Sequence, residues 1–244
     1  MTQQGEKFYE GKAKILYATE DPTLVIQYFK DDATAFNAQK RGTIVDKGVV
    51  NNKIASHLFE LLSREGVPTH FVKQLSDREM LVKRVAIVPL EVTIRNITAG
   101  GMSKMLGIEE GKALVPPVFE WHYKSDPLND PLINDDHILA LALATPAELE
   151  TIRRWSFRVN DALRAYFAAR GIDLVDFKLE FGRCPASSPV GQGQLLLADE
   201  ISPDTCRFWE QGTKKKLDKD RFRRDLGDVE AAYQEMLKRV MSDE

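Results

Sequence analysis

Hydrophobic and polar residues alternate most regularly over residues 174–182, which read LVDFKLEFG. Side chains on a β-strand point alternately to the two faces of a sheet, so this alternation predicts a strand with one apolar face and one charged face. The apolar face would carry Val175, Phe177, Leu179 and Phe181, and the charged face Asp176, Lys178 and Glu180. We expect the apolar face to lie in the core and the charged face to meet solvent or carry chemistry.

The next segment is expected to return beside this strand. Residues 183–194 contain prolines and glycines typical of a long hairpin connection, and a strand over residues 195–201 would follow. Asp199 and Glu200 would then lie next to Glu180. Carboxylates near a lysine suit Mg²⁺ and a transferring phosphoryl group. A solvated strand face with an ordinary Lys–Glu pair would produce the same pattern.

The N-terminal part predicts a hairpin that carries lysines. Residues 9–17 alternate after Gly11, which places Lys12 and Lys14 on one face, and a second strand is expected over residues 24–30. Two lysines at this spacing reach adjacent phosphates of a nucleotide beneath a glycine-rich hairpin. An edge strand protected by lysines explains the pattern equally well.

Further strands are expected over residues 69–75 and 80–88. Pro89 is interpreted as a hinge between two lobes, because nucleotides commonly bind in such interlobe clefts. After the hinge, alternation over residues 91–95 places Glu91, Thr93 and Arg95 on one face.

Three longer helices follow from apolar stripes and start signals. Residues 46–66 repeat apolar positions at helical spacing, and a C-terminal helix is expected over residues 228–241. Between them, a helix over residues 145–169 begins with Thr145 as cap and Glu148 completing a capping box.

A second candidate site follows Arg95. The chain turns at Gly100-Gly101 before a short helix predicted over residues 102–107, and free N–H groups there could bind an anion together with Arg95. A plain connection explains these residues about as well. Residues 121–131 form a proline-rigidified loop with Lys124 and Asp130, which is a candidate substrate loop, although these residues also favour turns for local reasons.

Composition narrows the possible functions. The chain has 244 residues, is 43% hydrophobic and 29% charged, and carries a formal net charge of -3, which argues against nucleic-acid binding as a main task. The two cysteines and four histidines lack the spacing of a zinc site or a disulfide framework. No apolar run is long enough to cross a membrane, so we expect a cytoplasmic protein.

Several ordered motifs together resemble the phosphoribosylaminoimidazole-succinocarboxamide synthase (SAICAR synthetase) family. They span nearly the whole chain, and their joint occurrence is far more specific than any one of them. They are Gly11-Lys-Ala-Lys14, Leu81-Val-Lys-Arg84, Val88-Pro-Leu-Glu91, Arg95-Asn96 with Ala99-Gly100, Asp176-Phe-Lys-Leu-Glu-Phe-Gly182, Asp199-Glu200, Ser202-Pro-Asp204, Arg207 with Trp209, and Asp218-Lys-Asp-Arg-Phe-Arg223.

The resemblance implies an ATP-dependent ligase of purine biosynthesis. Its substrates would be ATP, L-aspartate and carboxyaminoimidazole ribonucleotide (CAIR), with Mg²⁺ as cofactor and an acyl phosphate as intermediate. The implied fold is α+β and two-lobed, ATP-grasp-like, with an antiparallel N-terminal β lobe over residues 1–88 that resembles a kinase nucleotide lobe. Residues 89–244 would form the larger lobe with C-terminal helices. We also expect a homo-oligomer, with a homodimer favoured, and no nucleic-acid or membrane partner.

The resemblance also assigns roles to individual residues. Glu180 and Asp199 would hold Mg²⁺ and, with Lys178, form the catalytic group. Lys12, Lys14, Lys83 and Val88 would bind ATP. The ribotide would contact Arg95, Gly100, Gly101, Ser103, Lys124, Asp130 and Arg207, while Lys219 and Asp220 would close the site.

One position departs from the family pattern. An Ala-Gly-Ser turn reads Ala99-Gly100-Gly101 here, so either Ser103 supplies the missing hydroxyl or backbone N–H groups suffice. Two rival functions share the same residues: a small-molecule ATP phosphotransferase, which would not need aspartate to release phosphate, and a nucleotide-sensing module, which would show no turnover.

Overall fold

The computed structural model describes residues 4–35, 39–185 and 191–242. Its smaller main sheet is antiparallel and has five strands in the order β1-β2-β3-β7-β6. The predicted pairing with residues 24–30 is confirmed, because Tyr17 pairs with Ile26. The predicted strand face shared by Lys12 and Lys14 is wrong, because residues 11–13 form a turn between the strands Lys7–Glu10 and Lys14–Ala18, closed by the Gly11 N–H donating to the Lys14 carbonyl at 2.8 Å. The strands are β1 (Lys7–Glu10), β2 (Lys14–Ala18), β3 (Leu24–Phe29), β6 (Phe71–Gln74) and β7 (Glu79–Lys83).

The larger sheet has six strands and contains the strand predicted over residues 174–182. Its order is β10-β9-β8-β11-β12, and β13 pairs with β11 beside β12. The strands are β8 (Ala86–Ile97), β9 (Ala113–Tyr123), β10 (Leu132–Ile133), β11 (Ile172–Arg183), β12 (Leu195–Ala198) and β13 (Cys206–Glu210), and a separate pair is formed by β4 (Asp32–Ala35) and β5 (Lys40–Thr43). Within the predicted hairpin connection, residues 186–190 lie outside the described part of the chain.

The predicted single strand over residues 80–88 is wrong. β7 ends at Lys83 and β8 begins at Ala86, so the chain changes sheets between them. Pro89 lies inside β8, where the pairing with β11 becomes irregular between Glu180 and Gly182. A bulge tolerates the missing N–H of proline, which is why this residue does not end the strand. The predicted division between residues 88 and 89 therefore falls within a continuous strand.

The three predicted longer helices are present as α1 (Lys47–Arg64), α4 (Pro146–Ala168) and α6 (Val229–Met241). Thr145 and Glu148 form the expected capping box at the start of α4. The shorter helices are α2 (Gly100–Leu106), α3 (Asp135–Ala140), α5 (Asp220–Arg223) and the 3₁₀ turn η1 (Asp126–Leu128). In the described part of the chain, none of the helices has the length and apolar character needed to span a membrane.

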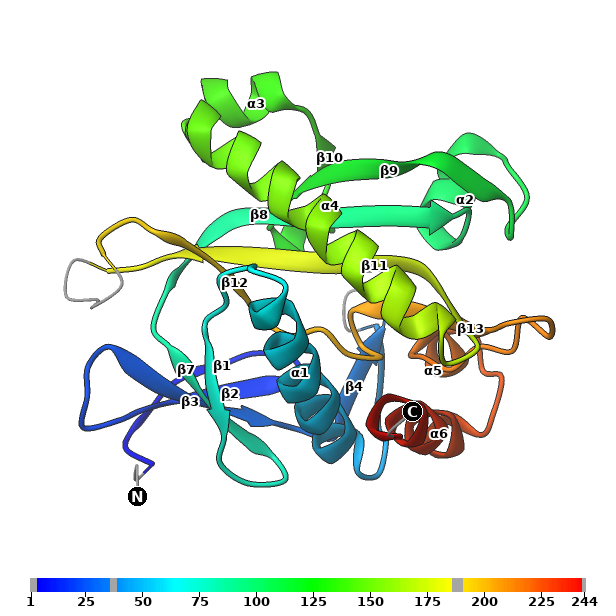
Figure 1. The fold of residues 1–244 in the computed structure, drawn as a ribbon, viewed down its shortest axis with the longest axis horizontal. Coiled ribbons are helices and arrows are strands. Elements are labelled where there is room, and N and C mark those ends of the chain that lie inside the picture. The colour runs from blue at the N-terminus through cyan, green and yellow to red at the C-terminus, as the bar shows by residue number, and fades with distance from the viewer. Residues whose placement is uncertain (1–3, 36–38, 186–190, 243–244) are drawn as a thin grey trace.

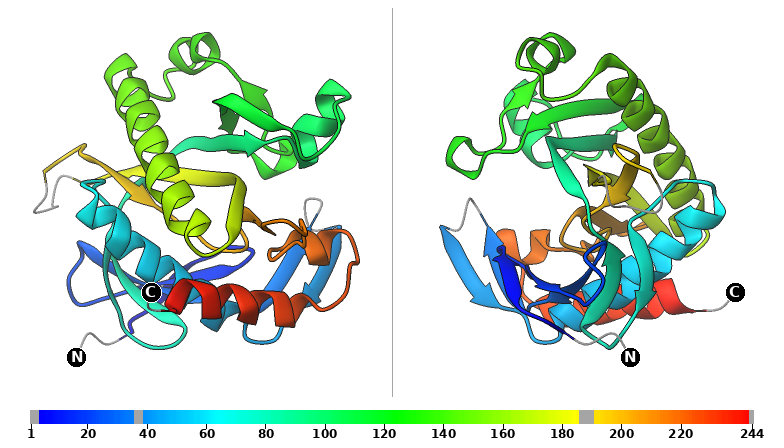
Figure 2. Two further views of the ribbon diagram at one scale, coloured as in Figure 1. Left: turned by 45° about the vertical axis from the view of Figure 1, so that its right-hand side comes forward. Right: turned by 90° about the vertical axis from the view of Figure 1, so that its left-hand side faces the viewer.

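The helices cover the two sheets on different sides of the molecule. Figure 1 shows α4 lying across the larger sheet, and α1 beside α6 near the smaller sheet. Figure 2 shows the smaller sheet and strands β8 to β11 on opposite sides of the molecule. Val50, Ile54 and Leu58 of α1 are fully buried in the same core cluster as Phe177 and Leu179 of β11. The two sheets therefore share one core.

The expected alternation along β11 holds for Phe177, Leu179 and Phe181, which are buried in this main core. It is wrong for Val175, which packs instead with Ala99 and Trp209 in a second cluster. The pairing with β13 shifts between Leu174 and Asp176, so a bulge at this point turns Val175 away from the main core.

A backbone connection joins the sheets beside the end of β12. His70 donates its N–H to the carbonyl of Leu197 at 2.8 Å, and Thr69 forms a parallel bridge with the same residue. This connection brings Asp199, two residues after Leu197, next to the smaller sheet.

Candidate active site

Two neighbouring strands carry a continuous strip of polar residues. In the antiparallel pairing of β8 and β11, Glu91 lies opposite Glu180, Thr93 opposite Lys178, and Arg95 opposite Asp176. Directly opposed residues place their side chains on the same face of a sheet. The two polar faces predicted from the sequence therefore form one surface, which we call the polar strip.

One end of the polar strip gathers the carboxylates of Glu180 and Asp199 with two lysines. Glu180 pairs in register with Ala198, and Asp199 follows directly. Lys14 contacts Asp199 and lies 3.0 Å from Glu200 Oε1, while Lys124 contacts Glu180. The structure thus brings together Lys14, Lys124, Glu180 and Asp199 from four separate segments.

The two carboxylates influence each other's ionisation. Burial and the neighbouring charge of Asp199 raise the pKa of Glu180 to about 7, against the opposing effect of Lys124. Burial also tends to raise the pKa of Asp199, but Lys14 outweighs it and holds that pKa below its usual value. Perturbed carboxyl groups of this kind are frequent at functional sites.

The backbone of Asp199 is held in an uncommon conformation. Its φ angle is 63°, in the left-handed region that non-glycine residues seldom adopt. Gln27 of β3 donates from Nε2 to the Asp199 carbonyl at 3.3 Å, so side chains from the smaller sheet contact both its carbonyl and its carboxylate. Such conformations cost about 1–3 kcal/mol and cluster at functional sites.

Glu180 and Asp199 fit a magnesium site completed by substrate. Among residues 4–35, 39–185 and 191–242 there is no group of three or more His, Cys, Asp or Glu side chains arranged to hold a metal. Mg²⁺ commonly uses only one or two carboxylates, with waters and substrate phosphates filling the other positions. The two carboxylates could supply that number of protein ligands, and Lys14 and Lys124 contact them.

Lys178 occupies the middle of the polar strip. Its ammonium contacts Glu91 and its side chain is 45% exposed, so it remains accessible to a ligand. Its backbone N–H donates to the Thr205 carbonyl at 2.9 Å, which places the turn between β12 and β13 beside it.

The other end of the polar strip carries the buried Arg95, and the half-buried Arg207 of β13 lies beside it. Arg95 contacts Glu120 at 2.8 Å and Asp176 at 3.0 Å. Arg207 donates from Nη1 to the same Asp176 at 2.7 Å and from Nε to Asp220 at 2.9 Å. Burial lowers the pKa of Arg207, but Asp176 and Asp220 outweigh that effect and raise it above its ordinary value. Carboxylates therefore orient both guanidinium groups.

Gly100, not Gly101, is the sterically constrained glycine. The helix predicted from residue 102 begins at Gly100, whose φ is +57°, and a Cβ there would come within 2.5 Å of Arg207 Nη2. A Cβ on Gly101 would meet nothing within 4 Å. The Ser103 hydroxyl is buried and has no hydrogen-bond partner within the described ranges.

The backbone N–H of Gly100 already has a partner in the protein. It donates to Glu110 Oε1 at 2.9 Å, in a turn that follows α2. The predicted set of free N–H groups is therefore wrong at Gly100.

Several other predicted site residues already make contacts within the protein. Lys12 is paired with Asp126 at 2.7 Å, and Lys83 donates to the Thr69 carbonyl at 3.2 Å. Val88 is fully buried in the core, so its side chain is not available to ATP. Asp130 accepts the N–H of Ser125 at 2.8 Å, which shapes its own loop.

The predicted closing residues belong to a buried ionic cluster. Lys219 lies 3.3 Å from Asp204, which also accepts from Lys47 at 2.9 Å and Tyr233 at 2.7 Å. Asp220 contacts Arg207, as described above. The cluster links α1, the turn after β12, and α6.

Sequence reasoning overlooked several residues that orient the site. Glu91 and Asp176 stood on the predicted polar faces, but their cross-strand partners follow only from the strand register in the structure. Gln27 and Lys47 lacked such a signal, because each acts through a segment that is distant in the sequence. Glu110 also lacked one, since its contact depends on the turn after α2.

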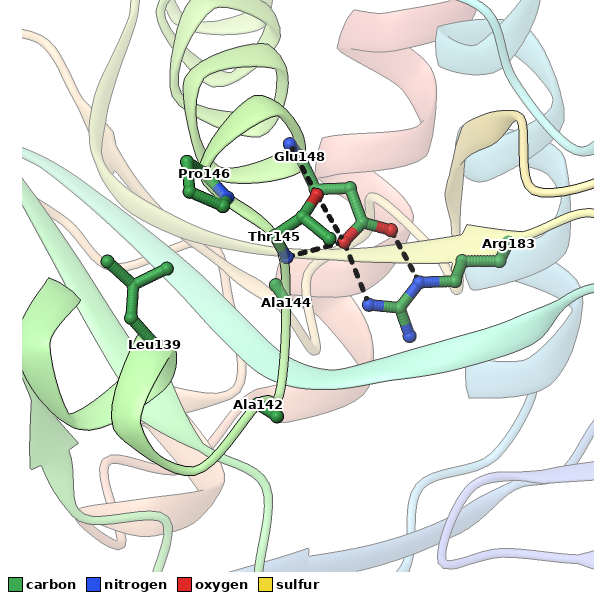
Figure 3. Close-up of a pocket in the computed structure, with 7 residues that line it drawn as sticks. All are labelled: Leu139, Ala142, Ala144, Thr145, Pro146, Glu148 and Arg183. Carbon is green, nitrogen blue, oxygen red and sulfur yellow. Dashed lines mark hydrogen bonds and ion pairs between the residues drawn. The ribbon is translucent and has the colours of Figure 1, made fainter.

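A separate hollow of about 460 Å³ lies where α4 begins. Figure 3 shows Arg183 paired with Glu148 at its edge, with Leu139 and Ala142 opposite. Arg183 Nε donates to Glu148 Oε1 at 2.5 Å. None of the predicted site residues lines this hollow, so we do not assign it to the active site.

Comparison with known proteins shows similarity over nearly the whole chain. A sequence model of the family described as SAICAR synthetase matches residues 7–240. A phosphoribosylaminoimidazole-succinocarboxamide synthase from Clostridium botulinum (strain Eklund 17B / Type B) is 57% identical over 235 residues, covering 96% of this chain and 97% of the relative.

Solved structures agree with this similarity. The crystal structure of phosphoribosylaminoimidazole-succinocarboxamide synthase from Ehrlichia chaffeensis superposes with a TM-score of 0.94 at 47% identity, covering 98% of this chain and 100% of that chain. A SAICAR synthetase (Type-2) in complex with ADP gives a TM-score of 0.90 at 42% identity, covering 97% and 98%.

Proposed function

This chain belongs to the SAICAR synthetase family of ATP-dependent ligases in purine biosynthesis, and we propose that it joins L-aspartate to the carboxylate of CAIR. The reaction would consume ATP and release ADP, phosphate and SAICAR. The observation that carries this proposal is the polar strip on β8 and β11, which has Glu180 at its carboxylate–lysine end and Arg95 at its arginine end.

The length of the polar strip suits a substrate with different groups at its two ends. Asp176 and Glu180 stand four positions apart on β11, and a strand rises about 3.3 Å per residue, which separates them by roughly 13 Å. A ribotide could therefore place its phosphate near Arg95 and Arg207 and its carboxylate near Glu180. Lys178 lies between the two ends.

The proposed chemistry has two steps. A carboxylate oxygen of CAIR attacks the γ-phosphorus of ATP, the bond to the bridging oxygen of ADP breaks, and an acyl phosphate forms. The aspartate amine then attacks the acyl carbon, and phosphate leaves with the original carboxylate oxygen while the amine loses a proton. Lys178 is suited to the first step, since its accessible ammonium can stabilise charge on the transferring group.

ATP would bind at the carboxylate–lysine end of the polar strip. Lys12 and Lys14 would contact its phosphates from the smaller sheet, with Lys83 nearby on β7. Val88 would contribute only through its backbone, because its side chain is buried. We propose a two-lobed, ATP-grasp-like organisation in which the nucleotide lies between the smaller sheet and the larger sheet.

The ribotide would bind along the remainder of the polar strip. Its phosphate would meet Arg95 and Arg207 beside Gly100 and Gly101, with the unpartnered Ser103 hydroxyl as a further candidate. Lys124 and Asp130 would contact the other end. Lys219 and Asp220 would close the site from the segment that precedes and begins α5.

Glu180 and Asp199 would hold Mg²⁺. When bound, the ion would neutralise phosphate charge and align the γ-phosphoryl group. Lys14 and Lys124 would orient these two carboxylates, and burial together with the charge of Asp199 raises the pKa of Glu180.

Omitting one substrate at a time tests the proposed function. ADP and phosphate release should require ATP, CAIR and L-aspartate together, and SAICAR should form in equal amount. ADP release without aspartate would favour a phosphotransferase, and nucleotide binding without turnover would favour a sensing module. With ¹⁸O in the CAIR carboxylate, one labelled oxygen should appear in phosphate if an acyl phosphate forms.

Two wider expectations accompany this proposal. We infer that the enzyme acts in the cytoplasm as a homodimer, without nucleic-acid or membrane partners. Sedimentation analysis of the purified chain would test the oligomeric state.

A further inference from the structure

The arginine end of the polar strip is electrically balanced before any substrate binds. Besides Arg95 and Arg207, this end includes two arginines from the end of α5 and the residue after it, Arg223 and Arg224. The four guanidinium groups form ion pairs with an equal number of carboxylates, those of Glu110, Glu120, Asp176 and Asp220. Each guanidinium lies within 3.0 Å of at least one of these carboxylates. A dianionic phosphate entering this cluster must therefore displace a carboxylate or be repelled by it.

Glu110 is the most readily displaced of these carboxylates. The side chains of Glu120, Asp176 and Asp220 are 9%, 5% and 1% exposed, whereas that of Glu110 is 31% exposed. Glu110 lies in the turn after α2, not on a strand. Its movement would therefore disturb less of the fold than movement of the other three.

The contacts of Glu110 coincide with those expected for the substrate phosphate. Its Oε1 accepts the Gly100 N–H at 2.9 Å, and Arg224 donates to both carboxylate oxygens, at 2.5 and 3.0 Å. Arg207 Nη2 lies directly against Gly100. An oxyanion bound to Arg207 and the Gly100 N–H would compete with the Glu110 carboxylate.

We propose that Glu110 is a specificity-determining residue that occupies part of the phosphate subsite until a dianionic phosphate group displaces it. This inference rests on the proposed function, because it takes the Gly100–Arg207 region as the ribotide phosphate subsite. On displacement, the Gly100 N–H exchanges the Glu110 oxygen for a phosphate oxygen, and Glu110 remains tethered by Arg224 or moves into solvent.

The competition would select for charge. A monoanion brings only as much negative charge as the Glu110 carboxylate that it displaces. Because binding also immobilises a free molecule, a monoanion should bind weakly. A phosphate dianion brings more charge and more acceptor oxygens to the guanidinium groups. The ionised state of Glu110 is secure, since hydrogen bonding to Arg224 lowers its pKa to about 2 against the effect of burial.

Glu110→Gln is the direct test, with Glu109→Gln as its matched control. Glutamine keeps a carbonyl oxygen for the Gly100 N–H but removes the competing charge. Glu109 is the adjacent residue and its side chain is exposed. Inorganic phosphate binding at pH 7.5, measured by calorimetry on the full chain, should become about tenfold tighter in Glu110→Gln, in line with the loss of one charge-assisted hydrogen bond. It should be unchanged in Glu109→Gln.

A second measurement tests selectivity. Acetate should inhibit Glu110→Gln by raising the KM for CAIR, and should have little effect on the wild type or Glu109→Gln. Thermal unfolding of all three proteins would identify a folding defect. If Glu110→Gln is folded but binds phosphate equally or more weakly, Glu110 supports the site instead of competing, and the inference is overturned.

This outcome is distinct from failure of the proposed function. Phosphate binding does not depend on turnover, so it can be measured even if the chain does not make SAICAR. Tighter phosphate binding in Glu110→Gln without ligase activity would retain the inference and reject the proposed reaction. Normal ligase activity with unchanged phosphate binding would support the proposed reaction and reject the inference about Glu110.

Discussion

The ammonium group of Lys14 contacts the carboxylate of Asp199, which joins strand β2 of the smaller sheet to the residue that follows β12 in the larger sheet. Glu200 Oε1 lies 3.0 Å from the same ammonium. Burial alone would lower the pKa of Lys14, but the two carboxylates outweigh it and keep the lysine charged. Lys14 therefore has a structural role in addition to the proposed contact with ATP.

Replacing Lys14 with Met should destabilise the protein, because Asp199 and Glu200 would lose their cation. Side-chain exposure is only 14% for Lys14 and 3% for Glu200. We expect a loss of about 3 kcal/mol in the free energy of unfolding, at the lower end for a broken buried ion pair. Lys12→Met is the control, since its exposed pair with Asp126 should contribute far less. Equal losses in urea denaturation would contradict this role for Lys14.

Metal dependence should reveal the roles of Glu180 and Asp199. If Glu180 and Asp199 bind Mg²⁺ as proposed, Glu180→Gln and Asp199→Asn each replace a carboxylate ligand with a neutral amide, so turnover should fall by ~10²-fold or more. Raising the Mg²⁺ concentration should recover part of the loss. Wild-type rates in both variants throughout a Mg²⁺ titration would rule out these residues as ligands.

Much of this site follows from local sequence patterns. Alternation in residues 91–95 and 174–182 predicts the two polar faces, and the structure pairs Glu91 with Glu180 and Arg95 with Asp176. The strand register could not be predicted, because each strand can slip against its neighbour without changing its own alternation. Without the register, the sequence could not show that Asp176 contacts both Arg95 and Arg207.

Other features depend on long-range packing. The bulge that turns Val175 into a second cluster leaves no clear mark in the sequence, and neither does the continuation of β8 through Pro89. Proline usually ends a strand, but the irregular pairing opposite it removes the need for its N–H. Tertiary pairing overrides the local signal at both positions.

The two adjacent glycines should respond differently to substitution. Gly100→Ala would place a Cβ against Arg207 at positive φ and should cost about 1–3 kcal/mol of stability. Gly101→Ala should leave stability unchanged or raise it, because that position is open and lies in a helix. Gly101→Val should keep the fold yet raise the KM for CAIR by obstructing approach to the backbone. Thermal unfolding and CAIR kinetics would check these outcomes, and an intolerant Gly101 with a tolerant Gly100 would contradict them.

Acid should weaken the contact between α4 and β11 through Glu148. Hydrogen bonds from Arg183, aided by those from Thr145, lower the pKa of Glu148 from 4.5 to about 2 against the effect of burial. A carboxyl group whose pKa is lowered on folding stabilises the folded state at pH values above its ordinary pKa of 4.5. This contribution disappears as the pH falls towards 2, the pKa in the folded state. Solvent screening limits it to about 1 kcal/mol.

Glu148→Gln should therefore be less stable than the wild type at pH 7, and the difference should shrink on acidification below pH 4.5. The exposed residue Glu150 on the same helix provides the control Glu150→Gln. Urea denaturation over this pH range would measure the difference. A constant difference between wild type and Glu148→Gln would show that the capping geometry, not the charge, stabilises this corner.

Substitutions at the two ends of the polar strip should affect different substrates. Arg207 uses Nη1 for Asp176 and Nε for Asp220, while Nη2 lies against Gly100. A lysine retains the charge but has one nitrogen and cannot make these separate contacts. Arg207→Lys should thus raise the KM for CAIR about tenfold, the cost of one charge-assisted hydrogen bond, and leave the KM for ATP nearly unchanged.

Lys12→Ala provides the opposite case, because Lys12 is proposed to contact the phosphates of ATP. It should raise the KM for ATP or lower kcat by misplacing the γ-phosphate, with little effect on CAIR. Steady-state kinetics with each substrate varied in turn would compare the two variants. Arg207 lies on β13 of the larger sheet and Lys12 in the turn between β1 and β2 of the smaller sheet, so a shared folding defect would not produce these opposite patterns. A defect of Arg207→Lys confined to ATP would instead mean that the arginine end binds the nucleotide and that the two substrates lie in the reverse order along the polar strip.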